Sequence, residues 1–245
     1  MRYLLFFMFC VGIFVVSKRS CHLSNGGWRF GSGVRGKGAA QTEKRAVTGF
    51  HAVDLEIAGD VEVSIAAEFS VEVQVQENLL PLLKTEVEDG ALRIYFSENV
   101  SYSEGVKIRV SGPSFDGLSV GGSGMIRMLT PAMAEKMKMD VSGSGDIYLE
   151  QATLQSASCA IAGSGTIHLG GTANSVKIDI SGSGDIKAKD LTVNDLDVDI
   201  AGSGSVTANV VQHLKADISG SGDVFYGGQP VVEANVSGSG SVKKM

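Results

Sequence analysis

The tripeptide Gly-Ser-Gly occurs seven times between Gly122 and Gly240, at intervals of 18 to 21 residues, and this repeat limits the fold more than any other feature. A period of this length is typical of solenoids, in which each repeat forms one coil that buries its apolar side chains against its neighbours. Glycine supplies the backbone angles that such tight turns require. The glycines expected at the turns are Gly122, Gly124, Gly143, Gly145, Gly163, Gly165, Gly182, Gly184, Gly202, Gly204, Gly220, Gly222, Gly238 and Gly240.

Between the motifs, apolar and polar residues alternate, as in the segments Lys177–Ser181 and Leu196–Ile200 of two successive repeats. Strict alternation indicates a strand with one face in the core and the other in water. We therefore predict an all-β chain that folds as a right-handed parallel β-helix, a solenoid with coils of about 18–21 residues. A series of antiparallel hairpins turning at each Gly-Ser-Gly is the alternative, and the uniform period favours the solenoid.

From the second motif on, the residue that follows Gly-Ser-Gly alternates between Asp and a hydroxyl residue. In a parallel stack these side chains would lie about 5 Å apart, where two carboxylates in water repel by about 0.8 kcal/mol. Interleaved Ser or Thr doubles the distance between carboxylates and offers each of them a hydroxyl donor. The alternation thus predicts a surface ladder of Asp146, Thr166, Asp185, Ser205, Asp223 and Ser241.

The same alternation, less regular in spacing, runs through residues 49–120, for example at Val61–Ile65 and Val71–Val75. We predict that residues 49–120 form an N-terminal β part of the solenoid with irregular coils, and that residues 121–245 form the regular repeat. Leu79–Leu83 breaks the alternation, which predicts a helical turn or a plug that caps the core.

The first twenty residues have the pattern of a signal peptide, with Arg2 before an apolar run of about 13 residues. Such a run is too short to cross a bilayer of roughly 30 Å as a helix. Cys21 follows directly and is a candidate for lipid attachment, while an ordinary secreted or uncleaved segment is the alternative. Residues 21–48 are predicted to form a glycine-rich tether. We expect an exported protein, attached to the outer membrane, at the cell surface or in the periplasm.

Charge and cysteine content exclude several classes of function. The net charge is −6, so a surface that neutralises the phosphates of a nucleic acid is not expected. Cys10 lies inside the signal peptide, and lipidation of Cys21 would leave Cys159 without a disulfide partner. Cys159 stands at an alternating position, which favours a small buried apolar side chain over a nucleophile.

Several catalytic and metal-binding patterns are present only in part. The G-x-G-x-x-G match at Gly31–Gly36 lacks the strand and the helix that nucleotide binding requires. The repeats resemble calcium-binding glycine-aspartate nonapeptides, but the alternation separates successive Asp residues by about 10 Å, too far to share one calcium. The four histidines form no closely spaced pair. We therefore expect no metal, no cofactor and no enzymatic activity.

At four places the sequence is similar to a known family. Val47–Val53, Gly59–Val63, Val71–Val75 and Glu77–Pro81, together with the Ser-Gly-Ser-Gly-Asp coils, resemble the head GIN domain family of auto-transporter adhesins. The resemblance covers about residues 30–245. It implies a signal-bearing, lipoprotein-like envelope protein with a right-handed β-helical fold, of the kind seen mostly in Bacteroidetes-type bacteria. The family supplies no established catalytic residues.

These observations favour a non-enzymatic scaffold of the cell envelope or surface, an adhesin that binds a surface glycan or an envelope protein through one face of the solenoid. Contact with a membrane would come only through the N-terminal lipid. One alternative is a structural envelope protein that self-assembles by end-to-end pairing of exposed strand edges. Another is a carbohydrate-active enzyme on a β-helix, which would need convergent acids with perturbed pKa values.

Overall fold

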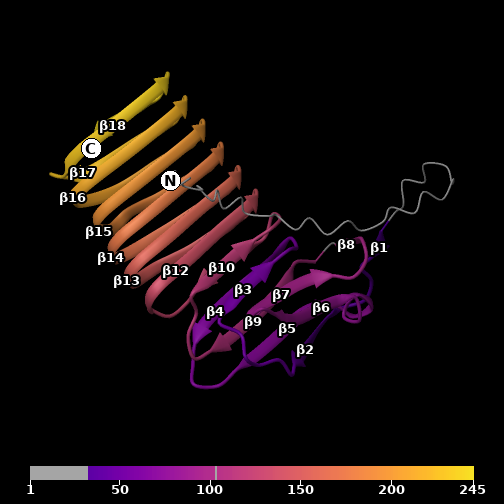
Figure 1. Ribbon diagram of the computed structural model, residues 1–245. Helices are drawn as coiled ribbons and strands as arrows, with labels where there is room; N and C mark the ends of the chain where they lie inside the picture. The colour runs from indigo at the N-terminus through magenta and orange to yellow at the C-terminus, as the bar shows by residue number, and fades with distance from the viewer. Residues whose placement is uncertain (1–32, 103) are drawn as a thin grey trace, which may run out of the picture. The chain divides into compact units, whose positions relative to one another are not determined.

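The computed structural model describes residues 33–102 and 104–245, which form nineteen strands and one short 3-10 turn (Figure 1). The signal peptide and Cys21 lie outside the described residues. The elements that precede the regular repeat are β1 Val34–Arg35, β2 Ala40–Arg45, β3 Ala52–Leu55, β4 Gly59–Ile65, β5 Ser70–Gln76, η1 Glu77–Leu79, β6 Leu83–Glu88, β7 Ala91–Phe96, β8 Val100–Ser101, β9 Val106–Gly112 and β10 Gly117–Val120.

The regular repeat forms long strands that bend around the core and pair in parallel with the coils before and after them (Figure 1). Asp179, for example, pairs with Ala160 on one side and with Asp199 on the other. The predicted parallel β-solenoid is confirmed, and the alternative of serial antiparallel hairpins is wrong. The strands are β11 Met125–Met128, β12 Ala132–Gly143, β13 Asp146–Gly163, β14 Thr166–Gly182, β15 Asp185–Gly202, β16 Ser205–Gly220, β17 Asp223–Gly228, β18 Val231–Gly238 and β19 Ser241–Lys244.

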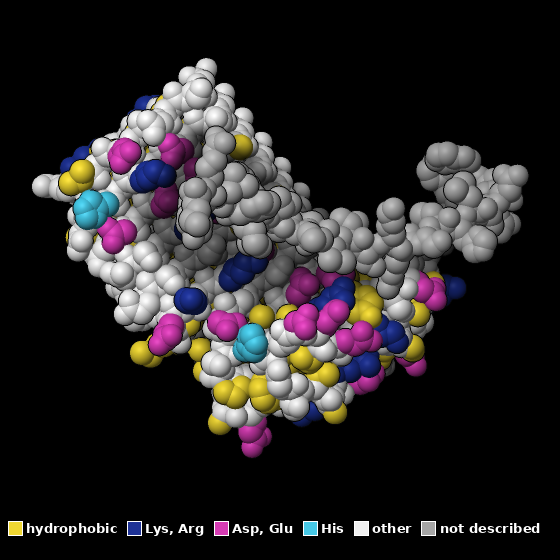
Figure 2. Space-filling model, in the orientation of Figure 1, with side chains coloured by type: hydrophobic (Ala, Val, Ile, Leu, Met, Phe, Trp, Pro, Cys, Tyr) yellow, Lys and Arg dark blue, Asp and Glu magenta, His cyan; other side chains and the backbone are white. Residues whose placement is uncertain are grey.

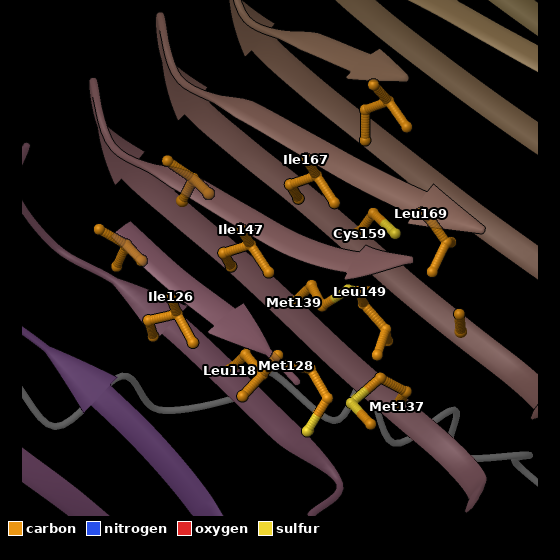
Figure 3. Close-up of a cluster of buried hydrophobic side chains, with 14 of the residues drawn as sticks. Leu118, Ile126, Met128, Met137, Met139, Ile147, Leu149, Cys159, Ile167 and Leu169 are labelled. Atoms are coloured by element: carbon orange, nitrogen blue, oxygen red, sulfur yellow. The ribbon is translucent and has the colours of Figure 1, made fainter. Parts of the chain in front are cut away.

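Equivalent apolar residues of successive coils stack in columns inside the solenoid. Figure 3 shows Ile126, Ile147 and Ile167 in one such column, each from a different coil, and all three side chains are fully buried. Each buried side chain therefore touches its counterpart above and below. Burial of a large aliphatic side chain contributes about 1.5–3 kcal/mol, so these columns supply the main stabilisation of the fold.

Each coil has three sides, because the alternation of buried and exposed residues is interrupted twice between one Gly-Ser-Gly motif and the next. In β15 two consecutive residues that are not buried lie between Ala188 and Leu191, and two more lie between Val193 and Leu196. We call the side that contains residues 195–201 of β15 the front face, since it faces the viewer in Figure 1. The side with residues 185–188 is the second face, and the side with residues 191–193 is the third face.

The third corner of each coil is the Gly-Ser-Gly motif, where neighbouring backbones lie too close for side chains. Gly182 has φ +132°, and a Cβ atom there would lie 2.4 Å from the carbonyl oxygen of Gly163 in the preceding coil. A Cβ on Gly184 would lie 2.4 Å from Cγ2 of Ile161. Between them, the Ser183 N–H donates to the Gly163 oxygen at 2.8 Å. The motif thus allows hydrogen-bonded contact between coils at the corner.

The N-terminal part does not wind in sequence order. β3 pairs with β10 on one side and with β7 on the other, so the β3–β4 coil lies between two coils that follow it in the chain. β5 and β6 pair antiparallel with β9 and β7, and β2 pairs antiparallel with β5. The turn η1 brings Leu79 to this end, where Leu79 and Leu83 are completely buried.

The segment predicted as a tether differs from that expectation in its second half. Residues 40–45 form β2 and exchange backbone hydrogen bonds with β5, from Ala40 opposite Gln76 to Arg45 opposite Val71. The β2 segment is rich in charged residues, as exposed edge strands often are. The glycine content of residues 21–48 did not indicate this strand.

We predict that Gly182→Ala lowers the free energy of unfolding by at least about 2 kcal/mol, because alanine would be strained at this φ and would collide with the Gly163 carbonyl. Urea unfolding followed by circular dichroism measures the change. Ser183→Ala, at the exposed centre of the same turn, is the control and should stay close to the unmodified protein. Equal stability of the two variants would contradict the role assigned to this corner.

Candidate binding surface

The front face carries straight rows of outward side chains, because parallel strands in register place equivalent residues one above another. We define two rows by the strands β12, β13, β14, β15, β16 and β18. The lysine row is Lys138, Ser158, Lys177, Asp197, Lys215 and Glu233, and the aspartate row is Asp140, Ala160, Asp179, Asp199, Asp217 and Asn235.

Lysines and aspartates of the two rows pair along the same strand. Lys138 lies 2.7 Å from Asp140, and Lys177 lies 3.1 Å from Asp179. Lys215 contacts both Asp217, at 2.9 Å, and Asp197 of the neighbouring coil, at 3.5 Å. These lysine side chains are about half exposed or more, so the ion pairs contribute little to folding stability.

The pKa directions at these pairs follow from their hydrogen bonds. Hydrogen bonds from Asn235 and Lys215 lower the pKa of the Asp217 carboxyl, and the bond to Asp179 raises the pKa of Lys177. Both groups are thus held in their charged forms at neutral pH. The front face therefore presents ordered positive and negative groups to solvent.

Two grooves hollow the front face. One, of about 620 Å³, crosses β12–β16. Its lining consists of members of the lysine row, the outward residues two positions before them, the apolar residues between these two sets, and Asp116. The other, of about 600 Å³, crosses β14, β15, β16 and β18 beside the glycine corner, and its lining includes Asp179, Asp199 and Asp217 with Ser181, Ala201 and Ser219. Figure 2 shows charged side chains of both signs gathered over this face, with uncharged surface between them.

The predicted ladder that follows Gly-Ser-Gly lies on the second face, where its members are in register and partly buried. The Ser205 hydroxyl donates to Asp185 Oδ1 at 2.5 Å, and the Ser205 backbone N–H donates to the same atom at 3.1 Å. Ser241 makes the equivalent hydroxyl contact with Asp223. The Thr166 backbone N–H donates to Asp146 at 3.0 Å. The Asp side chains of the ladder thus accept hydrogen bonds from hydroxyl and backbone N–H groups of the next coil. The ladder therefore helps to hold neighbouring coils together next to the turn.

A stack of aromatic and cationic groups lies next to that ladder on the second face. The Arg127 guanidinium lies 4.1 Å above the centre of the Tyr148 ring, and the Tyr148 and His168 rings stack at 4.3 Å. Burial lowers the pKa of His168, and the positive charge of Lys187 acts in the same direction. His168 is therefore neutral at pH 7. His213, by contrast, is exposed and lies 2.6 Å from Asp195 on the front face.

The front face also contains Asp54, a half-buried carboxyl in register with Arg93 and Ser119. Burial raises its pKa, and the negative charges of Glu56 and Asp140 act in the same direction. The hydrogen bond from Ser119 and the positive charge of Arg93 oppose that rise. Glycoside cleavage uses two carboxyl groups on either side of one bond. Neither groove of the front face includes Asp54, and its two partners in the row are not acids.

Among residues 33–102 and 104–245, no group of three or more His, Cys, Asp or Glu side chains is arranged to hold a metal ion. Within the same residues, no helix is long and apolar enough to cross a membrane.

The last described coil exposes side chains that the other coils bury. β18 pairs with β16 along one edge, so that Val232 continues the column of Leu214 and Val236 continues the column of Ile218. Val231, Val232 and Val236 are 70%, 38% and 43% exposed. An apolar edge strand of this kind is a template for pairing with another chain.

Sequence reasoning did not single out the lysine row, although its signal is present. Lys138, Lys177 and Lys215 each stand five residues before a Gly-Ser-Gly motif, with Asp three residues before it. Alternation alone indicates only that such residues face water, opposite the core. Only the stacking shows that they form one surface with two grooves.

The parallel coils and the broad polar face define the class of the protein, a β-solenoid with ordered rows of charged side chains on one face. The chain belongs to the family described as "Putative auto-transporter adhesin, head GIN domain", whose model matches residues 49–230. The resemblance noted in the sequence is thereby confirmed. This membership in an adhesin-like envelope family indicates an exported or surface protein.

Solved structures share the fold. A "putative adhesin" from Bacteroides fragilis has a TM-score of 0.80 at 23% identity and covers 87% of this chain and 100% of its own. A "putative lipid binding protein" from Parabacteroides distasonis has a TM-score of 0.75 at 27% identity, over 86% of this chain and 99% of its own. A "putative adhesin" from Parabacteroides merdae has a TM-score of 0.72 at 23% identity, over 86% and 98%. No curated protein matches the chain.

Cys159 is completely buried beneath the front face, and burial raises the pKa of its thiol to about 12. We predict that iodoacetamide leaves Cys159 unmodified in the folded protein at pH 8, because the reactive thiolate is almost unpopulated and shielded. Peptide mass spectrometry measures the modification, and the same reaction in guanidinium chloride, where the thiol is exposed, is the control. Rapid labelling of the folded protein would show that this coil opens.

Proposed function

We propose that the protein is a non-enzymatic scaffold of the cell envelope that binds a polymer or a protein partner through the front face. The observation that carries the proposal is the front face itself, where six strands in register display charged rows and two grooves of about 600 Å³ each. Exposed ion pairs add little to stability, so their regular arrangement is better explained by recognition of a repeating partner.

The family supports the cellular context of this proposal. Membership in an adhesin-like envelope family fits the signal peptide expected in residues 1–20 and a lipid on Cys21 that would hold the protein at the outer membrane. A structural relative is named for lipid binding, which makes lipid a competing ligand. The outward side chains of the front face are mainly Lys, Asp and Ser, which favours a polar partner. The larger groove also exposes parts of Met137, Ala157, Val176 and Leu196, which would lie against the apolar parts of that partner.

The test is a binding screen of the purified protein against a glycan array, intact cell envelopes and lipid vesicles, with and without calcium. We expect saturable binding to one class of ligand. Replacement of Asp179, Asp199 and Asp217 by Ala should change the affinity for this ligand, while replacement of Thr153, Thr172 and Thr192 on the third face, a matched row of three, should not. Binding that is equally sensitive to both sets, or that requires only vesicles, would contradict recognition by the front face.

The exposed β18 edge favours a second candidate, a structural protein that self-assembles through this coil. Two copies that pair along β18 would cover Val232 and Val236 and continue the apolar columns. Light scattering after size-exclusion chromatography would then show a dimer or larger assembly. Val232→Lys with Val236→Lys should convert it to a monomer, and Val211→Lys, at an exposed valine of β16, should not. A monomeric unmodified protein would rule out this candidate.

A further inference from the structure

The larger groove of the front face runs across five successive coils, from β12 to β16, parallel to the axis of the stack. Neighbouring strands lie about 4.8 Å apart, so the five strands span roughly 19 Å. A volume of about 620 Å³ spread over that length is an open channel, suited to an extended chain rather than a compact ligand.

Cationic groups line this channel at every second strand. Lys138, Lys177 and Lys215 belong to β12, β14 and β16, so their side chains recur at intervals of roughly 10 Å. One disaccharide of an extended polysaccharide has about that length. An extended peptide presents side chains on one face only every 7 Å or so, which does not match the interval.

The positions between the lysines carry the groups that an uncharged sugar needs. Ser158 lies between Lys138 and Lys177, and Asp197 lies between Lys177 and Lys215. A serine hydroxyl both donates and accepts hydrogen bonds, and a carboxylate accepts them from sugar hydroxyls. An acidic sugar at Asp197 would be repelled, so the row alternates between sites for a charged and for an uncharged unit.

Positive charge is strongest at the β12–β14 end of the channel. There β12, β13 and β14 contribute Lys136, Lys138 and Lys177 with three serines to the lining, and Asp116, which precedes β10, is the acidic lining residue at this end. Each ammonium has three N–H donors, so Lys138 and Lys177 keep donors for a ligand beyond their contacts with Asp140 and Asp179. Lys215 forms ion pairs with both Asp197 and Asp217, so it contributes less net positive charge to the channel.

We infer that this channel binds an acidic polysaccharide in which a carboxylate-bearing sugar alternates with an uncharged sugar, with successive carboxylates at Lys138 and Lys177. The inference rests on the proposed function and names the ligand class of that face. The carboxylates pair with the ammonium groups, and the intervening sugar lies over Ser158. Because the pairs are exposed, binding weakens as salt screens them.

The test measures the affinity of the full protein for three octasaccharide probes by titration calorimetry. The first is a hyaluronan fragment, in which uronate alternates with an uncharged sugar. The second is the same fragment with its carboxyl groups reduced to alcohols, and the third is an alginate fragment with a carboxylate on every sugar. We expect hyaluronan to bind best and its reduced form to lose at least about tenfold in affinity.

Two variants test the residues. Lys138→Gln with Lys177→Gln should weaken hyaluronan binding about tenfold or more, whereas Lys44→Gln with Lys107→Gln, the same charge change on the second face, should leave it unchanged. Ser158→Glu keeps both lysines and places a carboxylate between them, so it should also weaken binding. Circular dichroism confirms that each variant is folded.

The outcomes separate this inference from the proposed function. Equal binding of the reduced fragment, or no effect of the lysine and Ser158 variants, overturns the acidic ligand while a front-face scaffold stands. Binding to envelopes or neutral glycans without binding to hyaluronan would likewise overturn the acidic ligand and leave the front-face scaffold standing. Loss of all ligand binding in the screen and the titrations overturns both.

Discussion

The structure depends on the close, hydrogen-bonded stacking of one coil on the next at the glycine corner. The Ser183 N–H donates to the Gly163 carbonyl, and the same contact recurs from Ser144 to Ser239 along the repeat. Side chains at the two glycines would push neighbouring coils apart, since their Cβ atoms would lie within about 3 Å of the preceding backbone or its side chains. With the corner closed, strands on all three sides stay in register, and the apolar columns of the core remain continuous.

That register converts intervals in the sequence into straight rows in space. On the second face it puts each Asp of the ladder beside a hydroxyl or a backbone N–H, so this ladder is satisfied internally. On the front face it puts Lys138 and Lys177 two coils apart, with free donors toward solvent. The two faces thus differ: the side chains of the second face stabilise the turn, and those of the front face present a repeating pattern of charged groups to solvent.

The two ends of the described stack are built differently. At the N-terminal end, antiparallel strands and the turn η1 close the core over Leu79 and Leu83, and the outer strand β2 carries charged residues such as Glu43 and Lys44. Charge on an edge strand discourages pairing with other chains. β18, at the other end, has valines at the inward positions instead. The asymmetry bears on how copies of the protein or a partner could extend the sheet.

The sequence by itself determined the solenoid, because the Gly-Ser-Gly period and the alternation of residues such as Ile178 and Asp179 are local patterns that fix the turn and the buried face. It also anticipated the Asp and hydroxyl ladder, whose members stand at one repeat position. Only the tertiary structure decided that the β3–β4 coil lies between later coils and that residues 40–45 join the sheet, since strand order depends on pairing between distant segments. The channel likewise could be recognised only in the tertiary structure. Alternation shows that Lys138 and Lys177 point outward, but only the parallel stacking of coils places them two strands apart with Ser158 between them.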